Sequence, residues 1–182
     1  MDHTEAIIQI NNVVNKSLCD KVIKIIDQKA KKQMQVLNFG KNELDKKVRN
    51  VLGYNLQIKD RDIFNKINNE IQRLYIFYKI KFPKMYSSRI NQIDLLKYEV
   101  GGKYELHIDH GTVTNRHLSI IMNLNNDYEG GDLIFTDQKH NEIKRLKLGK
   151  GSIVFFPSNF MYPHGIKPIT KGTRYSIVAW LQ

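Results

Sequence analysis

The spacing of apolar residues differs between the two halves of the chain. In the first half, apolar residues recur every three to four positions in two stretches, which is the spacing that gathers them on one face of a helix. The first predicted helix begins at Ser17, a favourable N-cap residue, and the second begins at about Asp60. Their inward-facing residues are Leu18, Val22, Ile25 and Ile26 in the first helix and Ile63, Phe64, Ile67, Ile71 and Leu74 in the second.

A polar stretch, residues 34–57, separates the two predicted helices. It is interrupted by Gly40 and Gly53 and has no sustained helical spacing, so we predict a loop with short extended pieces. Long loops in compact domains are often functional, and we regard this one as a candidate lid.

The second half, from about Arg89, consists of short β-type runs separated by Gly, Asn, Asp and Lys. Evenly spaced short strands predict a β-sandwich or barrel of jelly-roll type. We therefore expect a mainly β fold, a double-stranded β-helix, with the N-terminal helices packed on one sheet. We also expect one domain over residues 1–182, in which 1–88 give helical support and the candidate lid and 89–182 form the core. The runs are INQIDLLKY, YELHIDH, RHLSIIMNLN, DLIFTD, EIKRLKL, SIVFF, PHGIKPI and TRYSIVAWLQ.

Composition narrows the class of protein. The 182 residues are 41% hydrophobic and 26% charged, which is typical of a globular domain. Cys19 is the only cysteine, which excludes an intramolecular disulfide framework and a multi-cysteine zinc site. The N-terminal residues lack the pattern of a signal peptide, and no apolar run approaches the ~20 residues of a spanning helix. We therefore expect a cytoplasmic protein with no membrane partner.

The net charge of +11 is unevenly distributed along the chain. Residues 1–90 hold 18 Lys and Arg against 9 Asp and Glu, whereas residues 91–182 hold 11 against 9. A basic surface is typical of proteins that bind nucleic acid, but a solvated surface in a Lys-rich chain is the simpler interpretation. The chain has no Arg/Lys run interleaved with aromatic residues, which would favour nucleic-acid binding. Nucleic acid is therefore the less favoured partner.

The most informative motif is His107-x-Asp109. Side chains two residues apart on a strand point to the same face, so this imidazole and this carboxylate can bind one metal ion. His164, at the start of a later predicted strand, is the candidate third ligand. Two His and one carboxylate leave other coordination positions open, the pattern of non-haem iron(II) oxygenases. A structural His–Asp pair is the alternative interpretation, because the short motif also arises by chance.

Arg174 opens the last predicted strand and adds context to the metal motif. Alternation places Arg174, Ser176, Val178 and Trp180 on one face. If that face lines the barrel, the guanidinium requires an anionic partner, because burial of an unpaired charge is costly. A guanidinium binds a carboxylate through two parallel hydrogen bonds, and Ser176 can add a hydroxyl donor. A metal and an interior arginine together predict a dicarboxylate cosubstrate; an exposed arginine on an edge strand is the alternative.

Further motifs, taken in order and spacing, make the chain resemble the 2-oxoglutarate/Fe(II)-dependent dioxygenases, and within them the prolyl 4-hydroxylase-like family. The likeness is close over about residues 90–182 and loose before them. The matching features are Tyr98, Tyr104, His107-x-Asp109, Arg116 at the start of a strand that ends in Leu124-Asn125, Tyr128-Glu-Gly130-Gly131-Asp132-Leu-Ile-Phe135, Gly149-Lys-Gly151-Ser-Ile-Val-Phe155-Phe156-Pro157, His164-Gly165, and Gly172-Thr-Arg174-Tyr175 through Trp180.

The resemblance implies a cofactor and a set of catalytic residues. It implies Fe(II) held by His107, Asp109 and His164, with 2-oxoglutarate and O2 as cosubstrates, and it leaves a need for ascorbate open. It also implies that Arg174 binds the distal carboxylate of 2-oxoglutarate.

Three further residues are candidate cosubstrate contacts. Tyr98 matches a position that commonly hydrogen-bonds the cosubstrate in the family. Many relatives carry a cosubstrate-contacting tyrosine where this chain has Asn123, whose amide can donate to a carboxylate. Ser176 joins them as the hydroxyl next to Arg174.

The resemblance implies hydroxylation of a C–H bond with release of succinate and CO2, and it favours a peptide or protein substrate, in the first place at proline. The segment 47–54 loosely resembles a substrate-closing loop, which makes Arg49 and Tyr54 candidate substrate contacts. A nucleic-acid base demethylase or a small-molecule hydroxylase of the same superfamily is the alternative, although the demethylase branch usually carries one more arginine after the cosubstrate arginine. A non-catalytic jelly-roll binding protein is the second alternative. The oligomeric state stays open.

Overall fold

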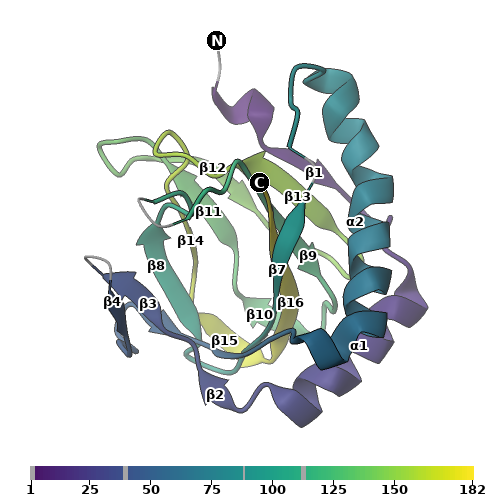
Figure 1. Ribbon diagram of the computed structural model, residues 1–182. Helices are drawn as coiled ribbons and strands as arrows, with labels where there is room; N and C mark the ends of the chain where they lie inside the picture. Colours follow the sequence, from purple (N-terminus) through teal and green to yellow (C-terminus); the bar gives the residue numbers. More distant parts are fainter. Residues whose placement is uncertain (1–2, 39–40, 88, 112–113) are drawn as a thin grey trace.

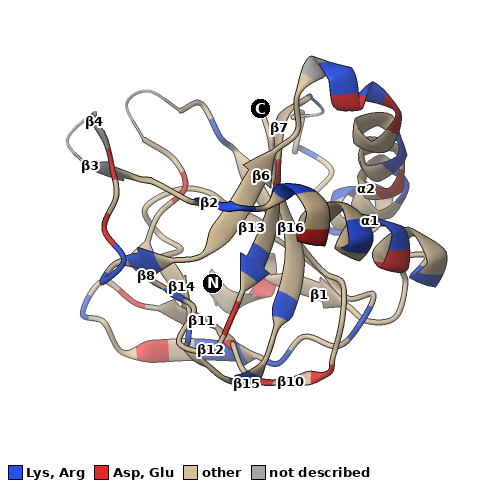
Figure 2. Ribbon diagram, turned by 90° about the horizontal axis from the view of Figure 1, so that it is seen from below, with Lys and Arg blue, Asp and Glu red and all other residues tan. Residues whose placement is uncertain are grey.

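The computed structural model describes residues 3–38, 41–87, 89–111 and 114–182 (Figure 1). Two α-helices, α1 (Lys16–Lys29) and α2 (Arg61–Lys81), lie side by side, and two short 3-10 turns, η1 (His3–Ala6) and η2 (Ile58–Asp60), precede strands or helices. Neither of the described helices has the length and apolar character needed to cross a membrane. Figure 2 shows Lys and Arg residues along both helices.

The strands form one large sheet, one smaller sheet and two two-stranded pairs, and all pairings of the described strands are antiparallel. In spatial order the large sheet contains β1 (Ile8–Ile10), β13 (Ile153–Pro157), β9 (Leu118–Asn123), β16 (Arg174–Leu181), β7 (Ile90–Tyr98), β6 (Leu52–Asn55) and β2 (Lys32–Gln33). The smaller sheet contains β12 (Glu142–Leu146), β11 (Leu133–Thr136), β14 (His164–Ile166), β8 (Lys103–His107) and β5 (Arg49–Asn50). The pairs are β10 (Tyr128–Gly130) with β15 (Ile169–Gly172), and β3 (Val36–Asn38) with β4 (Lys41–Glu43).

Two apolar cores hold these layers together. The first lies between the helices and the large sheet and contains Ile26 of α1, Ile71 of α2 and Ile177 of β16. The second lies between the two sheets and contains Leu96 of β7 and Leu133 of β11. The helices therefore cover the outer face of the large sheet, and the inner face looks into the barrel (Figure 1). The predicted mainly β jelly roll with helices on one sheet is confirmed.

The start of α1 differs from the prediction. The N-cap is Asn15, whose Oδ1 accepts hydrogen bonds from the backbone N–H of Ser17 at 2.9 Å and of Leu18 at 3.4 Å. Ser17 lies inside the first turn, and its hydroxyl donates to the same Oδ1 at 2.7 Å. The backbone N–H of Asn15 also donates to Glu70 of α2 at 3.0 Å. The prediction of Ser17 as the cap was wrong because two good cap residues lie two positions apart, and the contact with α2 favours the earlier one.

Several strand boundaries also differ from the prediction. The run YELHIDH is a strand only as far as His107, and PHGIKPI contains β14 and only the first residue of β15, which continues to Gly172. Strands β1 and β10 were not predicted, because three-residue strands carry almost no alternation signal. The candidate lid contains the expected short extended pieces, of which β6 extends the large sheet and β5 extends the smaller one. Gly40 lies outside the described residues.

We expect Asn15→Ala to lower the free energy of unfolding by about 1 kcal/mol, because it leaves two backbone N–H groups of α1 without their acceptor. Ser17→Ala keeps that acceptor and is the matched control, with an expected change of a few tenths of a kcal/mol. Urea denaturation followed by circular dichroism measures both values. Equal losses in the two variants would contradict the assignment of the cap.

Candidate metal centre

Strand pairing brings the two histidines together. In the register of β14 with β8, His164 is directly opposite His107. A Cβ atom at Gly165 would lie 2.9 Å from the carbonyl oxygen of Tyr104, so the residue after His164 must be glycine for the strands to approach this closely. Their rings are 4.3 Å apart between centroids.

Asp109 completes a cluster that could hold a metal ion. It lies two residues beyond the end of β8, and its Oδ1 and Oδ2 are 3.6 Å from His107 Nε2 and 3.5 Å from His164 Nε2. One ligand atom from each of the three residues lies within 4.8 Å of the others. The His107–Asp109 pair therefore converges although the strand has ended at His107.

Backbone carbonyl groups orient both imidazoles. His107 Nδ1 lies 2.9 Å from the carbonyl oxygen of Glu105, and His164 Nδ1 lies 3.0 Å from that of Tyr162. Each Nδ1 acts as the donor to its carbonyl, which leaves each Nε2 as the nitrogen with a free lone pair on the side of Asp109. This is the tautomer that a metal ion requires of both rings.

The protonation states of the cluster suit a cation. Burial and the neighbouring His107 lower the pKa of His164 to about 4, although Asp109 opposes this effect, so the ring is neutral near pH 7. Burial by itself would raise the pKa of Asp109, but His164, His107 and the hydroxyl of Ser119 hold it well below its usual range. Two imidazoles and one carboxylate are the ligand set of many divalent metal sites.

Ser119 of β9 fixes the carboxylate. Its hydroxyl donates to Asp109 Oδ2 at 2.6 Å, and it lies 2.8 Å from the hydroxyl of Ser158. Both serines are buried, with 0% and 1% of their surface exposed. The sequence analysis missed Ser119, although alternation along β9 places it on the same inner face as Asn123 and would have identified it.

Arg174 is more deeply buried in the same barrel and forms no ion pair with a carboxylate of the residues that the structure describes. It is 1% exposed, and its Nη1 donates to Ser176 Oγ at 3.1 Å. Its Nε and Nη2 are buried without a hydrogen-bond partner in the described part of the chain. The ring of Tyr98, itself 2% exposed, lies 5.1 Å from the guanidinium carbon. Two orphaned donors of one guanidinium fit a carboxylate group of a ligand, which would satisfy both at once.

Asn123 has a different environment from that of Tyr98 and Ser176. Its Nδ2 donates to the carbonyl oxygen of Asn125 at 2.6 Å and to that of Leu148 at 3.0 Å, and its Oδ1 accepts from the hydroxyl of Tyr128 at 3.3 Å. In the register of β16 with β9 it is opposite Ser176, so it forms part of the barrel wall. Both amide protons are thus engaged by the backbone of the adjoining turns.

The two candidate substrate contacts lie in different places. The guanidinium of Arg49 lies 4.6 Å from the ring of Tyr104, which stacks on His107 at 3.6 Å between centroids. Arg49 therefore lies next to the candidate centre. Tyr54 packs against the core beneath the helices, and its hydroxyl donates to Asp60 at 2.7 Å. The structure does not bring Tyr54 to the histidines.

Two further residues, Arg116 and Trp180, lie beside the centre, although neither was predicted as a site residue. The guanidinium carbon of Arg116 lies 3.6 Å from the ring centroid of Trp180, and its Nη1 lies 3.5 Å from the carbonyl oxygen of Asp109. The indole N–H of Trp180 is buried without an acceptor in the described ranges.

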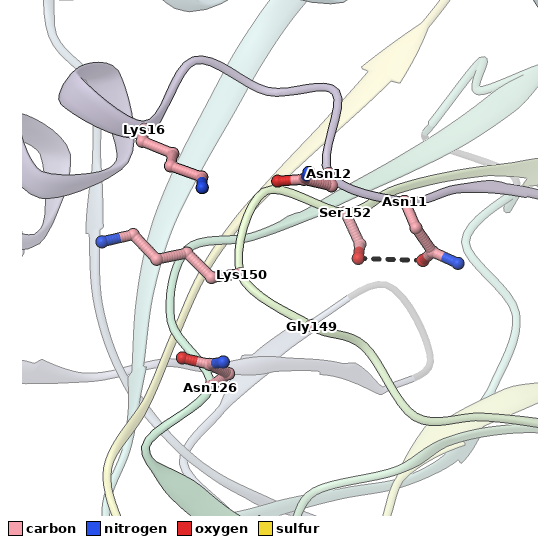
Figure 3. Close-up of a pocket in the computed structure, with 7 residues that line it drawn as sticks. All are labelled: Asn11, Asn12, Lys16, Asn126, Gly149, Lys150 and Ser152. Atoms are coloured by element: carbon pink, nitrogen blue, oxygen red, sulfur yellow. Dashed lines mark hydrogen bonds between the residues drawn. The ribbon is translucent and has the colours of Figure 1, made fainter.

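A separate surface hollow of about 480 Å³ lies elsewhere on the molecule (Figure 3). Lys16 and Lys150 extend toward it from the start of α1 and from the turn before β13, and Asn126 lies at its margin. Lys150 also forms an ion pair with Asp20 at 2.5 Å. The hollow contains none of the three candidate metal ligands, so it is distinct from the candidate centre.

Comparison with known proteins identifies relatives of this chain. Residues 93–182 match the family model described as the 2OG-Fe(II) oxygenase superfamily. A PKHD-type hydroxylase of Gloeothece citriformis is 27% identical over 134 residues, which cover 70% of this chain and 59% of the relative. The chain spans only 50–59% of the length of three such PKHD-type hydroxylases.

Solved structures share the fold. A prolyl hydroxylase from Trichoplax adhaerens, in complex with a peptide fragment of hypoxia inducible factor, has a TM-score of 0.78 at 17% identity and covers 98% of this chain and 84% of its own. A Pseudomonas putida prolyl-4-hydroxylase has a TM-score of 0.76 at 16% identity, with coverage of 97% and 92%. The likeness to the prolyl 4-hydroxylase-like family that the motifs indicated is confirmed.

We expect Ser119→Ala to weaken divalent metal binding by about tenfold or more, because groups that orient a ligating carboxylate typically have effects of this size. Anaerobic titration with Fe(II), or with Mn(II) as a redox-inert probe, measures the affinity without any turnover. Ser158→Ala, which removes a group one contact further from Asp109, is the control with a smaller expected effect. An unchanged affinity in Ser119→Ala would show that the hydroxyl does not fix the carboxylate.

Proposed function

This chain belongs to the 2OG-Fe(II) oxygenase superfamily, and on that premise we propose that it is a prolyl 4-hydroxylase-like dioxygenase that hydroxylates a peptidyl prolyl C–H bond. One observation carries the proposal: His107, Asp109 and His164 converge at one end of a barrel whose interior also holds the buried, anion-free guanidinium of Arg174. A metal site and a carboxylate site inside one cavity match a chelating dicarboxylate cosubstrate.

The three clustered residues would hold Fe(II). His107 Nε2, His164 Nε2 and a carboxylate oxygen of Asp109 form a ligand set on one side of the ion, and Glu105, Tyr162 and Ser119 keep these atoms oriented. When bound, iron, 2-oxoglutarate and O2 together supply the oxidising chemistry, with succinate and CO2 as by-products. The protein contributes the geometry and a buried environment that excludes water.

Arg174 would hold the distal carboxylate of 2-oxoglutarate. Its two unpartnered donors and the adjacent hydroxyl of Ser176 provide the binding groups, and Tyr98 lies over the guanidinium as one wall. Asn123 forms part of the wall of this proposed 2-oxoglutarate site, because its amide protons already donate to the backbone carbonyl oxygens of Asn125 and Leu148.

The residues around the metal ligands support a peptide as the substrate. Trp180 offers a buried indole N–H without an acceptor in the described part, and Arg116 lies on its ring beside Asp109. Such donors suit the carbonyl groups of a peptide backbone, and an aromatic ring suits the apolar face of proline. Arg49 and Tyr104 extend this wall past His107, so we retain Arg49 as a substrate contact and assign Tyr54 to the support of α2 through Asp60.

The names of the relatives point in the same direction. One structural neighbour is a prolyl hydroxylase with a peptide bound, and a human relative named prolyl 3-hydroxylase 2 is 35% identical over 68 residues. The basic charge that suggested a nucleic-acid substrate lies mostly in residues 1–90, and Figure 2 shows part of it along the two helices. A peptide is therefore the substrate class that we propose.

We expect Arg174→Ala to weaken 2-oxoglutarate binding by about a hundredfold, because it removes two charge-assisted hydrogen bonds to the distal carboxylate. The affinity can be read anaerobically from the visible absorption band of the Fe(II)–2-oxoglutarate chelate, and metal affinity alone should stay unchanged. Arg145→Ala is the matched control, since Arg145 pairs with Glu142 and Asp132 at the surface. Absence of the band in the unmodified protein would favour a non-catalytic binding protein.

The substrate class is tested by succinate release in the presence of candidate substrates. We expect stimulation by proline-rich peptides and none by the same peptides with alanine in place of proline, with a product 16 Da heavier on a proline ring in mass spectrometry, the mass of one added oxygen atom. Methylated oligonucleotides and free amino acids serve as the competing arms. Stimulation confined to either of those arms would refute the peptide proposal while leaving the oxygenase assignment intact.

A further inference from the structure

A second carboxylate lies inside the barrel and has no part in the function proposed above. Asp94 of β7 is 2% exposed, and in the sheet it is opposite Val178 of β16 and Asn55 of β6. The amide of Asn55 donates to its Oδ1 at 2.6 Å. No Lys, Arg or His within the described ranges forms an ion pair with it, so this buried charge is balanced by a group further away.

Gln92 connects Asp94 to the metal centre. Its Nε2 lies 3.0 Å from Asp94 Oδ1 and 3.2 Å from Oδ2, so the amide nitrogen faces the carboxylate. The amide oxygen must then point the other way, where Oε1 accepts a hydrogen bond from Arg116 Nη2 at 3.2 Å. A carboxylate, an amide and a guanidinium thus form one polarised chain.

The guanidinium of Arg116 depends on this chain of hydrogen bonds, because the carboxylate of Asp109 is engaged by other groups. Its guanidinium is half-buried on the ring of Trp180, and Nη1 reaches only the backbone carbonyl of Asp109. The carboxylate of Asp109 faces His107 and His164 and accepts from Ser119. Asp94 is therefore the anion that remains available to balance Arg116.

We infer that Asp94, acting through Gln92, is a positioning residue that holds the guanidinium of Arg116 on Trp180 at the edge of the metal centre. Held there, Arg116 presents its remaining N–H groups to a substrate carbonyl. The contact of Arg116 with a substrate carbonyl rests on the proposed function. The positioning of Arg116 by Asp94 involves groups of the protein alone and needs neither iron nor substrate.

Trp180 is the only tryptophan of the chain, so its fluorescence reports directly on the stack. Arg116→Ala gives the spectrum of the indole without its guanidinium. We expect Asp94→Asn, which removes the charge but keeps the size, to shift emission and acrylamide quenching toward the Arg116→Ala values. The double variant Gln92→Glu/Asp94→Asn moves the carboxylate one residue closer to Arg116 and should restore the original spectrum.

Two control variants separate this role from a purely structural one. Asp132→Asn removes a carboxylate from another arginine, Arg145, which lies on the edge strand of the smaller sheet whereas Trp180 lies in the large sheet, and should leave the spectrum unchanged. Asn55→Ala removes the other hydrogen bond to Asp94 and should lower thermal stability with little spectral change. A spectrum of Asp94→Asn identical to that of the unmodified protein, with Arg116→Ala different, would overturn the inference.

A double-mutant cycle provides the second readout and decides the matter if Arg116→Ala itself leaves the fluorescence unchanged. Asp94→Asn and Arg116→Ala should be non-additive in the equilibrium constant of unfolding, by about threefold or more for a coupled pair. Additive effects would overturn the inference.

With a peptide that supports turnover, Asp94→Asn should lower kcat/KM for the peptide by about tenfold, the size expected for a misplaced charged hydrogen bond, and leave 2-oxoglutarate affinity unchanged.

Discussion

The antiparallel pairing of β14 with β8 is the constraint on which the candidate centre depends. His164 comes 55 positions after Asp109 in the chain, and only the register of these two strands places it opposite His107. A shift of one residue would turn the imidazole to the other face of the sheet, because successive side chains of a strand alternate. Gly165 secures that register, since a side chain there would collide with the backbone at Tyr104.

Charge balance organises the interior that this pairing creates. The inner wall holds the carboxylates of Asp109 and Asp94 and the guanidinium groups of Arg174 and Arg116, so these four charges cancel in number, although Arg174 forms no ion pair with a carboxylate of the described residues. A divalent cation bound together with a dicarboxylate preserves that balance. Each of the two ligands alone would leave a surplus of buried charge, which is costly in a low-dielectric environment. The binding of metal and cosubstrate is therefore expected to be mutually favourable.

The helices have a supporting role in this arrangement. They seal the outer face of the large sheet through residues such as Ile26 and Ile71, which keeps the strands in register. Their outer surface carries much of the positive charge of the first half (Figure 2). The Lys and Arg residues of the helices are thus separated from the barrel interior by the large sheet.

The class of fold, the helix faces and the candidate ligands could be predicted from the order of residues in the chain. Each of these is a local property: the period of apolar residues decides helix or strand, and a short motif names His107 and Asp109. The end of β8 at His107, the cap at Asn15 and the small strands β1 and β10 were not predictable, because they depend on contacts with distant segments.

The polar residues that act on the centre could be identified only from the folded chain. Ser119 reaches Asp109 from β9, and Gln92 joins Asp94 of its own strand to Arg116, which precedes β9; alternation gives the face on which Ser119 lies but not the partner of either residue. Arg49 and Tyr54 show the same limit, since they lie five positions apart in the sequence but face different cores. The physical reason is that hydrogen bonds and charge pairs inside a barrel join residues by register and side-chain direction, which one chain's local pattern does not encode.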